Sequence, residues 1–253
     1  MELSEALERH RPRGGAAPAP APARTGEWRL QLLGTWVLDC DGAVVPVPHR
    51  AQRLITALAL LDPRPRAYLA GLLWPDSTEE QAAGNLRNCV WKISHHYPGL
   101  LERQKDPLVL RSGLVVDVDL LSAAFDPAGC FPGPPYAKES IELLSRAELL
   151  PGWYDDWLLH EQERVRQLRV GALERMAELS LAAGRVGTAI DAARAAAAIE
   201  PLRESAHRLL MEGHLAAGNR ASAYCVYDRL HCRLGEELGI LPSPELKNLV
   251  ANL

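Results

Sequence analysis

The sequence Leu181-Ala182-Ala183-Gly184 recurs as Leu215-Ala216-Ala217-Gly218, with the second copy 34 residues after the first. This spacing is the period of tetratricopeptide repeats, in which each unit is a hairpin of two helices. An alanine-containing segment follows each copy, as it would in a true repeat, although chance similarity between alanine-rich helices is the alternative. We therefore expect the second half to be an all-α, tetratricopeptide-like helical array, a scaffold that usually binds a partner.

Length and composition predict a soluble protein with two modest domains. The chain has 253 residues, 47% of them apolar. It has no apolar run of about eighteen residues that could cross a bilayer, so no membrane association is expected. The charged first residues do not form a secretory signal, which predicts a cytoplasmic location. Five scattered cysteines, without a CxxC motif, indicate reduced thiols: Cys40, Cys89, Cys130, Cys225 and Cys232.

The first half changes from a strand pattern to a helix pattern and back. We expect residues 1–26 to be a disordered Pro/Ala-rich tail, because the Pro-Ala alternation between Gly14 and Thr25 cannot pack and favours an extended linker. Alternating apolar residues then predict three short strands, at 28–33, 36–38 and 44–47. Helical periodicity predicts three helices, at 50–61, 67–74 and 79–96. Two further strands, 108–111 and 114–118, flank a Ser112-Gly113 turn and predict a β-hairpin wing.

This order is that of an α+β winged helix. We assign residues 27–124 to a winged-helix DNA-binding domain and residues 125–253 to the helical-repeat domain. Proline and glycine between residues 127 and 135 predict a loop at the start of the second domain.

Several blocks of the sequence resemble the Streptomyces antibiotic regulatory protein (SARP) family. In the first half these are Leu32-Leu33-Gly34, Arg50 to Leu54, Leu72 to Ser77, Glu79 to Asn88 and Val116 to Asp119. The second half resembles the bacterial transcriptional activator domain of that family, in Trp153 to Trp157, Glu161 to Arg164, Glu200 to Glu204 and Leu234 to Leu246. Together the blocks cover roughly residues 28 to 250 in one order.

The resemblance implies a short-form transcriptional activator. Such a protein binds promoter direct repeats, contacts RNA polymerase and regulates a biosynthetic gene cluster, antibiotic biosynthesis being the family's typical target. A homodimer on DNA is one arrangement that it allows.

The predicted helix at 79–96 carries the candidate base-reading residues. On a helical wheel Leu86, Val90, Ile93 and Tyr97 form one stripe, which we expect to be buried. The opposite face and its flanks present amide, cationic and aromatic side chains, which suit the major groove: Asn85, Arg87, Asn88, Trp91, Lys92 and His95. Asn88 is the best candidate for a base contact, while Trp91 could instead dock on the helical domain. Gly84, on the same face, allows close approach to DNA or is a tolerated imperfection.

Phosphate contacts are expected from residues at the periphery and on the wing: Arg50, Arg66, Arg103, Lys105 and Arg111. The charge of this half is unusual for a DNA-binding domain, since residues 27–125 carry ten Lys and Arg against eleven Asp and Glu. Only residues 87–111 are locally basic. Arginines that the family carries late in the third helix are replaced here by Ile93 to Tyr97. The alternative function is therefore a protein-interaction adaptor whose winged helix has weak or no DNA affinity.

No enzymatic function or cofactor is predicted. The sequence contains no GxGxxG, P-loop, nucleophile elbow or HExxH motif. His95 and His96 point about 100° apart on a helix and do not form a metal site. His207 with His214, and Cys225 with His231 and Cys232, also lack zinc spacing. Arg164, Arg166, Arg169 and Arg175 could form a phosphate strip, but interleaved glutamates favour an ion-paired, solvated face.

Overall fold

The computed structural model describes residues 26–102, 106–124 and 138–251. In the N-terminal half, the described elements are four strands and four helices: β1 (Trp28–Gln31), β2 (Val37–Cys40), β3 (Ala43–Val45), α1 (His49–Leu60), α2 (Arg66–Leu73), α3 (Glu79–His96), β4 (Val115–Val116) and α4 (Asp117–Ala124). The C-terminal half contains α5 (Lys138–Arg146), α6 (Asp156–Ala182), α7 (Val186–Ile199), α8 (Glu204–Ala216), α9 (Arg220–Leu238) and α10 (Pro244–Ala251). The predicted tail lies outside the described residues except for Gly26.

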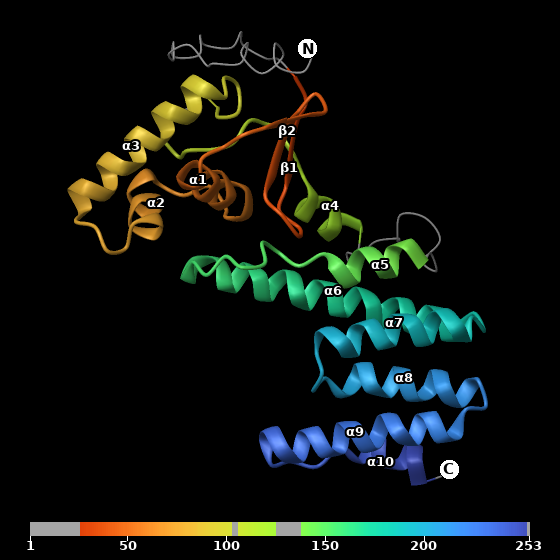
Figure 1. The fold of residues 1–253 in the computed structure, drawn as a ribbon. Helices are drawn as coiled ribbons and strands as arrows, with labels where there is room; N and C mark the ends of the chain where they lie inside the picture. Colours follow the sequence, from red (N-terminus) through yellow and green to blue (C-terminus); the bar gives the residue numbers. More distant parts are fainter. Residues whose placement is uncertain (1–25, 103–105, 125–137, 252–253) are drawn as a thin grey trace, which may run out of the picture.

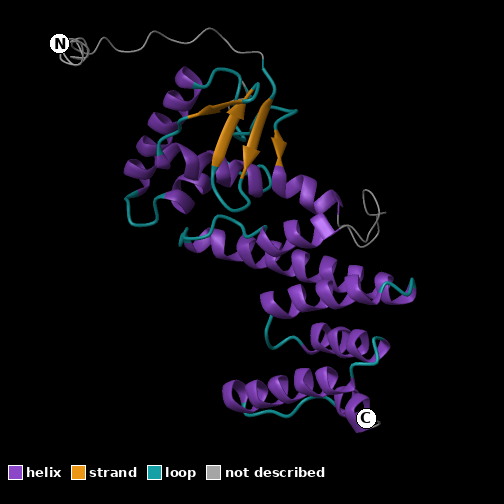
Figure 2. Cartoon of the chain, turned by 45° about the vertical axis from the view of Figure 1, so that its right-hand side comes forward, coloured by secondary structure: helices purple, strands orange, loops and turns teal. Residues whose placement is uncertain are grey.

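The strands form one sheet in the order β3-β2-β1-β4. β1 pairs antiparallel with β2, and β2 pairs antiparallel with β3, as the alternating sequence predicted. Trp28 and Leu30 are buried, whereas Arg29 and Gln31 between and after them are exposed. The sheet therefore has one apolar face, and Figure 2 shows helices lying against it. The predicted fold class, a winged helix with a small sheet covered by helices, is confirmed.

The predicted pairing of the wing is wrong in detail. Residues 114–118 do not pair with 108–111; instead β4 pairs parallel with β1, with Val116 opposite Leu30. The hairpin is formed by Leu101 opposite Leu110, where Arg111 N donates to Leu100 O at 2.9 Å. Ser112 and Gly113 still form a turn, since Leu114 N donates to Arg111 O. This turn leads into β4 rather than closing a hairpin.

Asp117 explains why the strand predicted at 114–118 ends at Val116. Its carboxylate accepts hydrogen bonds from Leu32 N and Leu33 N, each at 2.9 Å, beyond the end of β1. Asp117 and Asp119 also lie in the first turn of α4, where negative charge favours a helix. Burial raises the pKa of Asp117, opposed by its backbone hydrogen bonds. An alternating Val-Asp sequence therefore begins a helix instead of continuing a strand.

The repeated sequence ends two helices in the same way. Gly184 and Gly218 follow α6 and α8 with φ angles of 70° and 75°, a left-handed conformation that glycine adopts freely. Arg185 N and Asn219 N each donate across the turn at 2.8 Å, to Ser180 O and His214 O. α7 and α9 then begin. The repeat is therefore structural, and Figure 1 shows the resulting helices stacked in layers.

Small residues allow these layers to approach closely. Four alanines of α7 are fully buried: Ala189, Ala192, Ala193 and Ala196. Gly213 of α8 faces the same helix, and a Cβ at Gly213 would lie 2.8 Å from the Ile190 side chain. The alanine-rich composition of this half is therefore used for close helix packing.

The two halves share one hydrophobic core and a short stretch of backbone pairing. Residues 32–34 pair antiparallel with residues 148–150, which lie between α5 and α6. Gly34 N donates to Glu148 O at 2.7 Å, and Leu150 N donates to Leu32 O at 3.0 Å. The buried cluster that begins at Trp28 continues without a break to Leu210. The predicted boundary at 124/125 adjoins residues outside the described part and remains a prediction.

Side-chain contacts strengthen the connection between the two halves around residues 32–34 and 148–150, which we call the junction. Arg53 of α1 pairs with Asp155, and both side chains are about four-fifths buried, at 20% and 18% exposure. The His49 ring lies 4.9 Å from that of Trp153. Gln162 of α6 holds the same segment, because its amide donates to the carbonyls of Leu149, Leu150 and Trp153. The first turns of α1 are therefore fixed to the segment that precedes α6.

Arg169 has a structural role that the sequence did not predict. It is buried, and its guanidinium donates to Leu144 O at 2.7 Å and Ser145 O at 2.8 Å. These carbonyls belong to the last turn of α5, where a helix lacks internal donors. Burial lowers the pKa of Arg169, while Glu148 acts in the opposite direction. Arg169 is thus part of the packing between α5 and α6, not of a solvated strip.

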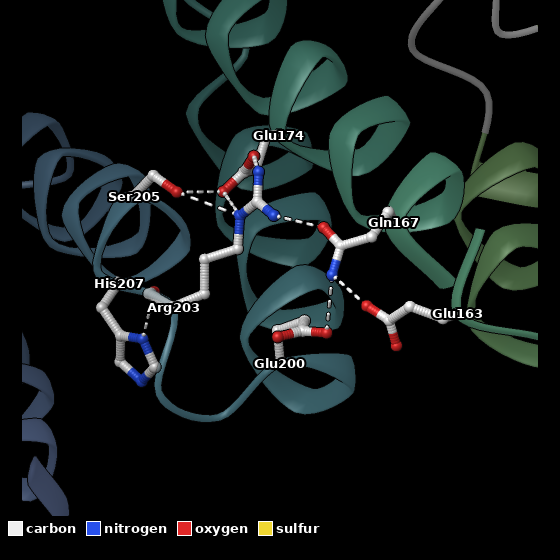
Figure 3. Close-up of polar contacts among 7 residues, drawn as sticks. All are labelled: Glu163, Gln167, Glu174, Glu200, Arg203, Ser205 and His207. Atoms are coloured by element: carbon white, nitrogen blue, oxygen red, sulfur yellow. Dashed lines mark hydrogen bonds and ion pairs between the residues drawn. The ribbon is translucent and has the colours of Figure 1, made fainter. Parts of the chain in front are cut away.

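A second polar network joins α6 to the turn before α8 (Figure 3). Arg203 donates to both carboxylate oxygens of Glu174, at 2.9 and 2.8 Å, and to the Gln167 side chain at 2.9 Å. Ser205 also donates to Glu174. His207 Nδ1 lies 3.0 Å from Arg203 O, in hydrogen-bonding contact with it. The segment from Glu200 to Glu204, one of those that resemble the SARP family, therefore fixes the position of α8 relative to α6.

Replacing Arg169 by Met tests the first of these roles. The variant leaves the last carbonyls of α5 without a buried donor, so we expect a loss of about 1–3 kcal/mol in the free energy of unfolding. Arg175→Met, on the same helix, removes an exposed pair with Glu178 and should cost about 0–1 kcal/mol. Urea denaturation measures both values. Equal losses would contradict the role assigned to Arg169.

His207 predicts a loss of stability in acid. Burial lowers its pKa from 6.5, although its hydrogen bond to Arg203 O acts in the opposite direction. The unfolded chain therefore takes up the proton more readily, and stability falls as the pH drops below about 6.5. His207→Gln should show a shallower fall in the urea midpoint between about pH 7.5 and about pH 5.5. A slope identical to that of the unmodified chain would contradict the prediction.

Candidate nucleic-acid interface

α3 begins at a capping box, which fixes its start. Thr78 Oγ1 accepts a hydrogen bond from Gln81 N, and the Gln81 side chain accepts one from Thr78 N. Glu79 and Glu80 occupy the first turn, where negative charge complements the helix dipole. The sequence therefore specifies the register of this helix from its first residue.

One face of α3 is buried in the N-terminal core. Leu86, Ile93 and Tyr97 are buried as expected, and Val90 is half-buried. Cys89 is also buried, and the Tyr97 hydroxyl donates to Pro46 O at 2.8 Å. These contacts fix the rotation of the helix, and with it the direction of the opposite face.

The opposite face is open to solvent and contains most of the predicted base-reading residues. Arg87, Asn88, Trp91, Lys92 and His95 are exposed, and Asn85 is half-buried. Figure 1 shows α3 at the outer edge of the N-terminal half, away from the helices α6 to α10. The geometry therefore leaves this face free to meet a large partner such as a DNA duplex.

A groove of about 410 Å³ separates this face from the start of α1. Its lining brings together four of the predicted contact residues, namely Arg50, Asn85, Asn88 and Lys92. His49 and His96 also line it, and the sequence analysis did not select either one as a contact residue. The signal that could have revealed His96 is spacing, because it lies four residues after Lys92 on the same helix face. Trp74 is half-buried beside the groove and packs against the core.

Cys89 is a buried residue that lines this groove. Its thiol lies 3.5 Å from Arg50 O and donates a hydrogen bond to it. Burial raises the pKa of the Cys89 thiol, while Lys92 and Arg50 act to lower it. Both cations therefore lie near the Cys89 thiol at this groove, although the charge of the whole half is nearly balanced.

The remaining predicted phosphate contacts occupy different environments. Arg66 is half-buried at the start of α2, and its backbone N–H donates to Asp106 at 3.1 Å. Arg111 is half-buried, and its guanidinium donates to Gly26 O at 3.4 Å. Arg103 and Lys105 lie outside the described residues. Arg66 and Arg111 are not among the residues that line the groove.

The arginines of α6 mostly form ion pairs. Arg164 pairs with Glu161, Arg166 with Glu163 and Glu200, and Arg175 with Glu178. An ion-paired helix face is therefore confirmed for these three residues. It is wrong for Arg169, whose acceptors are the backbone carbonyls at the end of α5.

The part of the chain that is described contains cysteines and other side chains of the kinds that bind metals. Within it, no group of three or more His, Cys, Asp or Glu side chains is placed to hold a metal ion. Among the described residues, Cys40, Cys89, Cys225 and Cys232 are not in disulfides, and Cys130 lies outside the described residues. In the same ranges, none of the helices combines the length and the apolar character needed to cross a bilayer.

Comparison with known proteins places the chain in a family. The family "BTAD: Bacterial transcriptional activator domain" matches residues 142–253. Transcriptional regulatory protein MoaR1 of Mycobacterium tuberculosis is 35% identical, in an alignment that covers 88% of this chain and 78% of the relative. The chain belongs to the SARP family. The MoaR1 relative of this SARP chain is a transcriptional regulator by its name.

Longer relatives share only part of their length with this SARP chain. Regulatory protein AfsR of Streptomyces coelicolor is 29% identical, over 80% of this chain but only 23% of the relative. A structure titled "Mycobacterium tuberculosis EmbR in complex with low affinity phosphopeptide" matches with a TM-score of 0.64 and 18% identity. That match covers 90% of this chain and 65% of the other. It supports the same fold, a winged helix followed by a helical domain.

Gly84 provides a test of the outward face. It is helical and half-buried, and a Cβ there would meet only the Arg87 guanidinium, at 3.8 Å. Gly84→Ala should therefore raise the free energy of unfolding by about 1 kcal/mol. If Gly84 permits close approach to DNA, the same variant weakens DNA binding while stabilising the protein.

Thermal unfolding and DNA binding by fluorescence anisotropy separate the two effects. Ala83→Gly, at the neighbouring half-buried position, is the matched control and should destabilise α3 by a similar amount. A destabilised Gly84→Ala variant would contradict the expectation of open space at this position.

Proposed function

We propose that this SARP chain is a sequence-specific, DNA-binding transcriptional activator. In this proposal α3 enters the major groove of promoter direct repeats. The observation that carries it is the outward face of α3, which is exposed and bears amide, cationic and aromatic side chains. The family supplies the coarser function, transcription regulation.

The side chains of α3 suit base recognition. Asn85 and Asn88 can each pair with an adenine through two hydrogen bonds, and Arg87 or Lys92 can contact guanine. Each such pair contributes about 1–3 kcal/mol of discrimination against a wrong base. Asn88 is the strongest candidate because it is exposed and also lines the groove beside α1.

Phosphate contacts would orient α3 in the major groove of the DNA. Arg50 and Lys92 both line the groove beside α1, so the two cations could contact one stretch of the phosphate backbone. We retain Arg66, Arg103, Lys105 and Arg111 as further phosphate contacts of this proposal. Because the formal charge of the domain is nearly balanced, binding should depend strongly on these few cations and on salt.

The helical domain would present the activating surface. Its layers are fixed to α1 by the junction, so a protein bound to them would keep a set position relative to the promoter. We propose RNA polymerase as that partner, a biosynthetic gene cluster as the target and the bacterial cytoplasm as the location. The protein would need no cofactor and perform no catalysis, and two copies could occupy adjacent repeats as a homodimer.

The charge balance also supports a second candidate. Residues 27–125 carry one more acidic than basic residue, which is unusual for a domain that binds DNA. A protein-interaction adaptor would use the same fold without reading DNA. It predicts a stable protein complex that forms in the absence of DNA.

Fluorescence anisotropy with the whole chain distinguishes these functions. The probes are the intergenic duplex upstream of its own gene and a scrambled duplex, each measured across a salt series. The activator should prefer the native duplex and lose affinity as salt rises. Equal or absent binding to both duplexes would favour the adaptor.

Two variants assign the contacts. Asn88→Ala should reduce the preference for the native duplex by about 5- to 150-fold, because a base contact is lost, and leave the salt slope unchanged. Lys92→Ala should lower the salt slope by about one if Lys92 contacts a phosphate. Lys247→Ala, an exposed lysine on α10, is the control. Unchanged binding in both α3 variants, with folding intact, would contradict the proposed interface.

A further inference from the structure

Trp91 is a large apolar residue that is exposed to solvent and does not pack in the core. It lies on the outward face of α3 with 62% of its surface exposed. Its ring is parallel to that of His95, one turn later, with an interplanar angle of 5° and centroids 5.2 Å apart. These two stacked rings form an aromatic pair on the outward face, which we call the Trp91–His95 plate.

The plate lies where a base contact would be made. Trp91 is three residues after Asn88 and His95 is four residues after Trp91, so the amide and the plate follow one another along the same face. Trp91 does not line the groove beside α1, in which the cations gather. The plate therefore points outward from the helix, with Arg87 one turn before Trp91 and with Arg50 and Lys92 at the groove beside α1.

A large apolar side chain in the major groove has one kind of apolar partner among the bases. Thymine carries a C5-methyl group there, whereas the edges of the other bases present polar donors and acceptors. Trp91 offers an extended apolar surface and only one donor, the indole N–H. Packing against a methyl group removes apolar surface of both partners from water.

We propose that the Trp91–His95 plate reads thymine through its C5-methyl group, next to the base contacted by Asn88. This inference rests on the proposed DNA-binding function and adds a specificity determinant to it. His95 acts as a positioning residue, because its parallel ring holds the indole in one orientation. The half-site therefore contains a thymine at the position facing the second half of α3.

Replacing thymine by deoxyuridine tests the proposal, because it removes the methyl group and keeps base pairing. The probe is the duplex that the full-length chain selects from a random-sequence library. Each thymine of that duplex is replaced in turn, and affinity is measured by anisotropy. At the position read by the plate, we expect affinity to fall about fourfold for each methyl group lost.

Trp91→Ala should bind the thymine and deoxyuridine duplexes equally at that position. Tyr224→Ala removes an exposed aromatic residue from α9, outside the proposed interface, and should keep the fourfold difference. If Trp91→Ala binds too weakly for comparison, the same pair of duplexes is measured at lower salt, where phosphate contacts restore affinity.

Each outcome separates this inference from the proposed function. A selected sequence with a deoxyuridine effect that disappears in Trp91→Ala supports both. A selected sequence without any deoxyuridine effect overturns the plate and leaves the DNA-binding function intact. An effect that persists in Trp91→Ala assigns the methyl contact to another residue and also overturns the plate. Failure to select any sequence overturns the proposed function, and the inference with it.

Discussion

The backbone pairing between residues 32–34 and 148–150 is the constraint on which the arrangement of this protein depends. It joins the end of β1 to the segment between α5 and α6, through hydrogen bonds of 2.7 and 3.0 Å. The Asp117 carboxylate satisfies the backbone N–H groups of Leu32 and Leu33 at the same place. A buried backbone donor without a partner is costly, so these bonds favour one relative position of the two halves. The Arg53–Asp155 pair and the shared hydrophobic core act in the same direction.

This constraint links the two parts of the proposed function. α1 contacts the junction through Arg53 and His49, and its first turn also forms one wall of the groove beside α3. The element that would meet the DNA backbone is therefore the element that is fixed to the helical domain. A chain built in this way would place its helical layers at a defined angle to the promoter. Such a geometry suits an activator that positions a second protein, and it requires no change of shape on binding.

Local patterns predicted much of the fold, whereas long-range contacts escaped the sequence analysis. The repeated Leu-Ala-Ala-Gly predicted two equivalent helix ends because left-handed glycine is a local requirement. The faces of α3 followed from helical periodicity in the same way. By contrast, the parallel pairing of β4 with β1 joins residues more than 80 positions apart, and no local pattern specifies it. Arg169 was misplaced because its acceptors lie on another helix, 24 and 25 residues away. The groove between α1 and α3 was only partly predicted, because the sequence analysis did not select His49, which lines it from α1.

Hydrogen exchange at the junction tests the central claim most directly. The amides of Gly34 and Leu150 donate the two hydrogen bonds of the pairing, and mass spectrometry of short peptides can follow both. If the junction fixes the two halves, these amides should exchange as slowly as those in the middle of α1 and α6, because opening them requires global unfolding. Rapid exchange at both positions, with α1 and α6 still protected, would show that the halves move independently and would contradict this account.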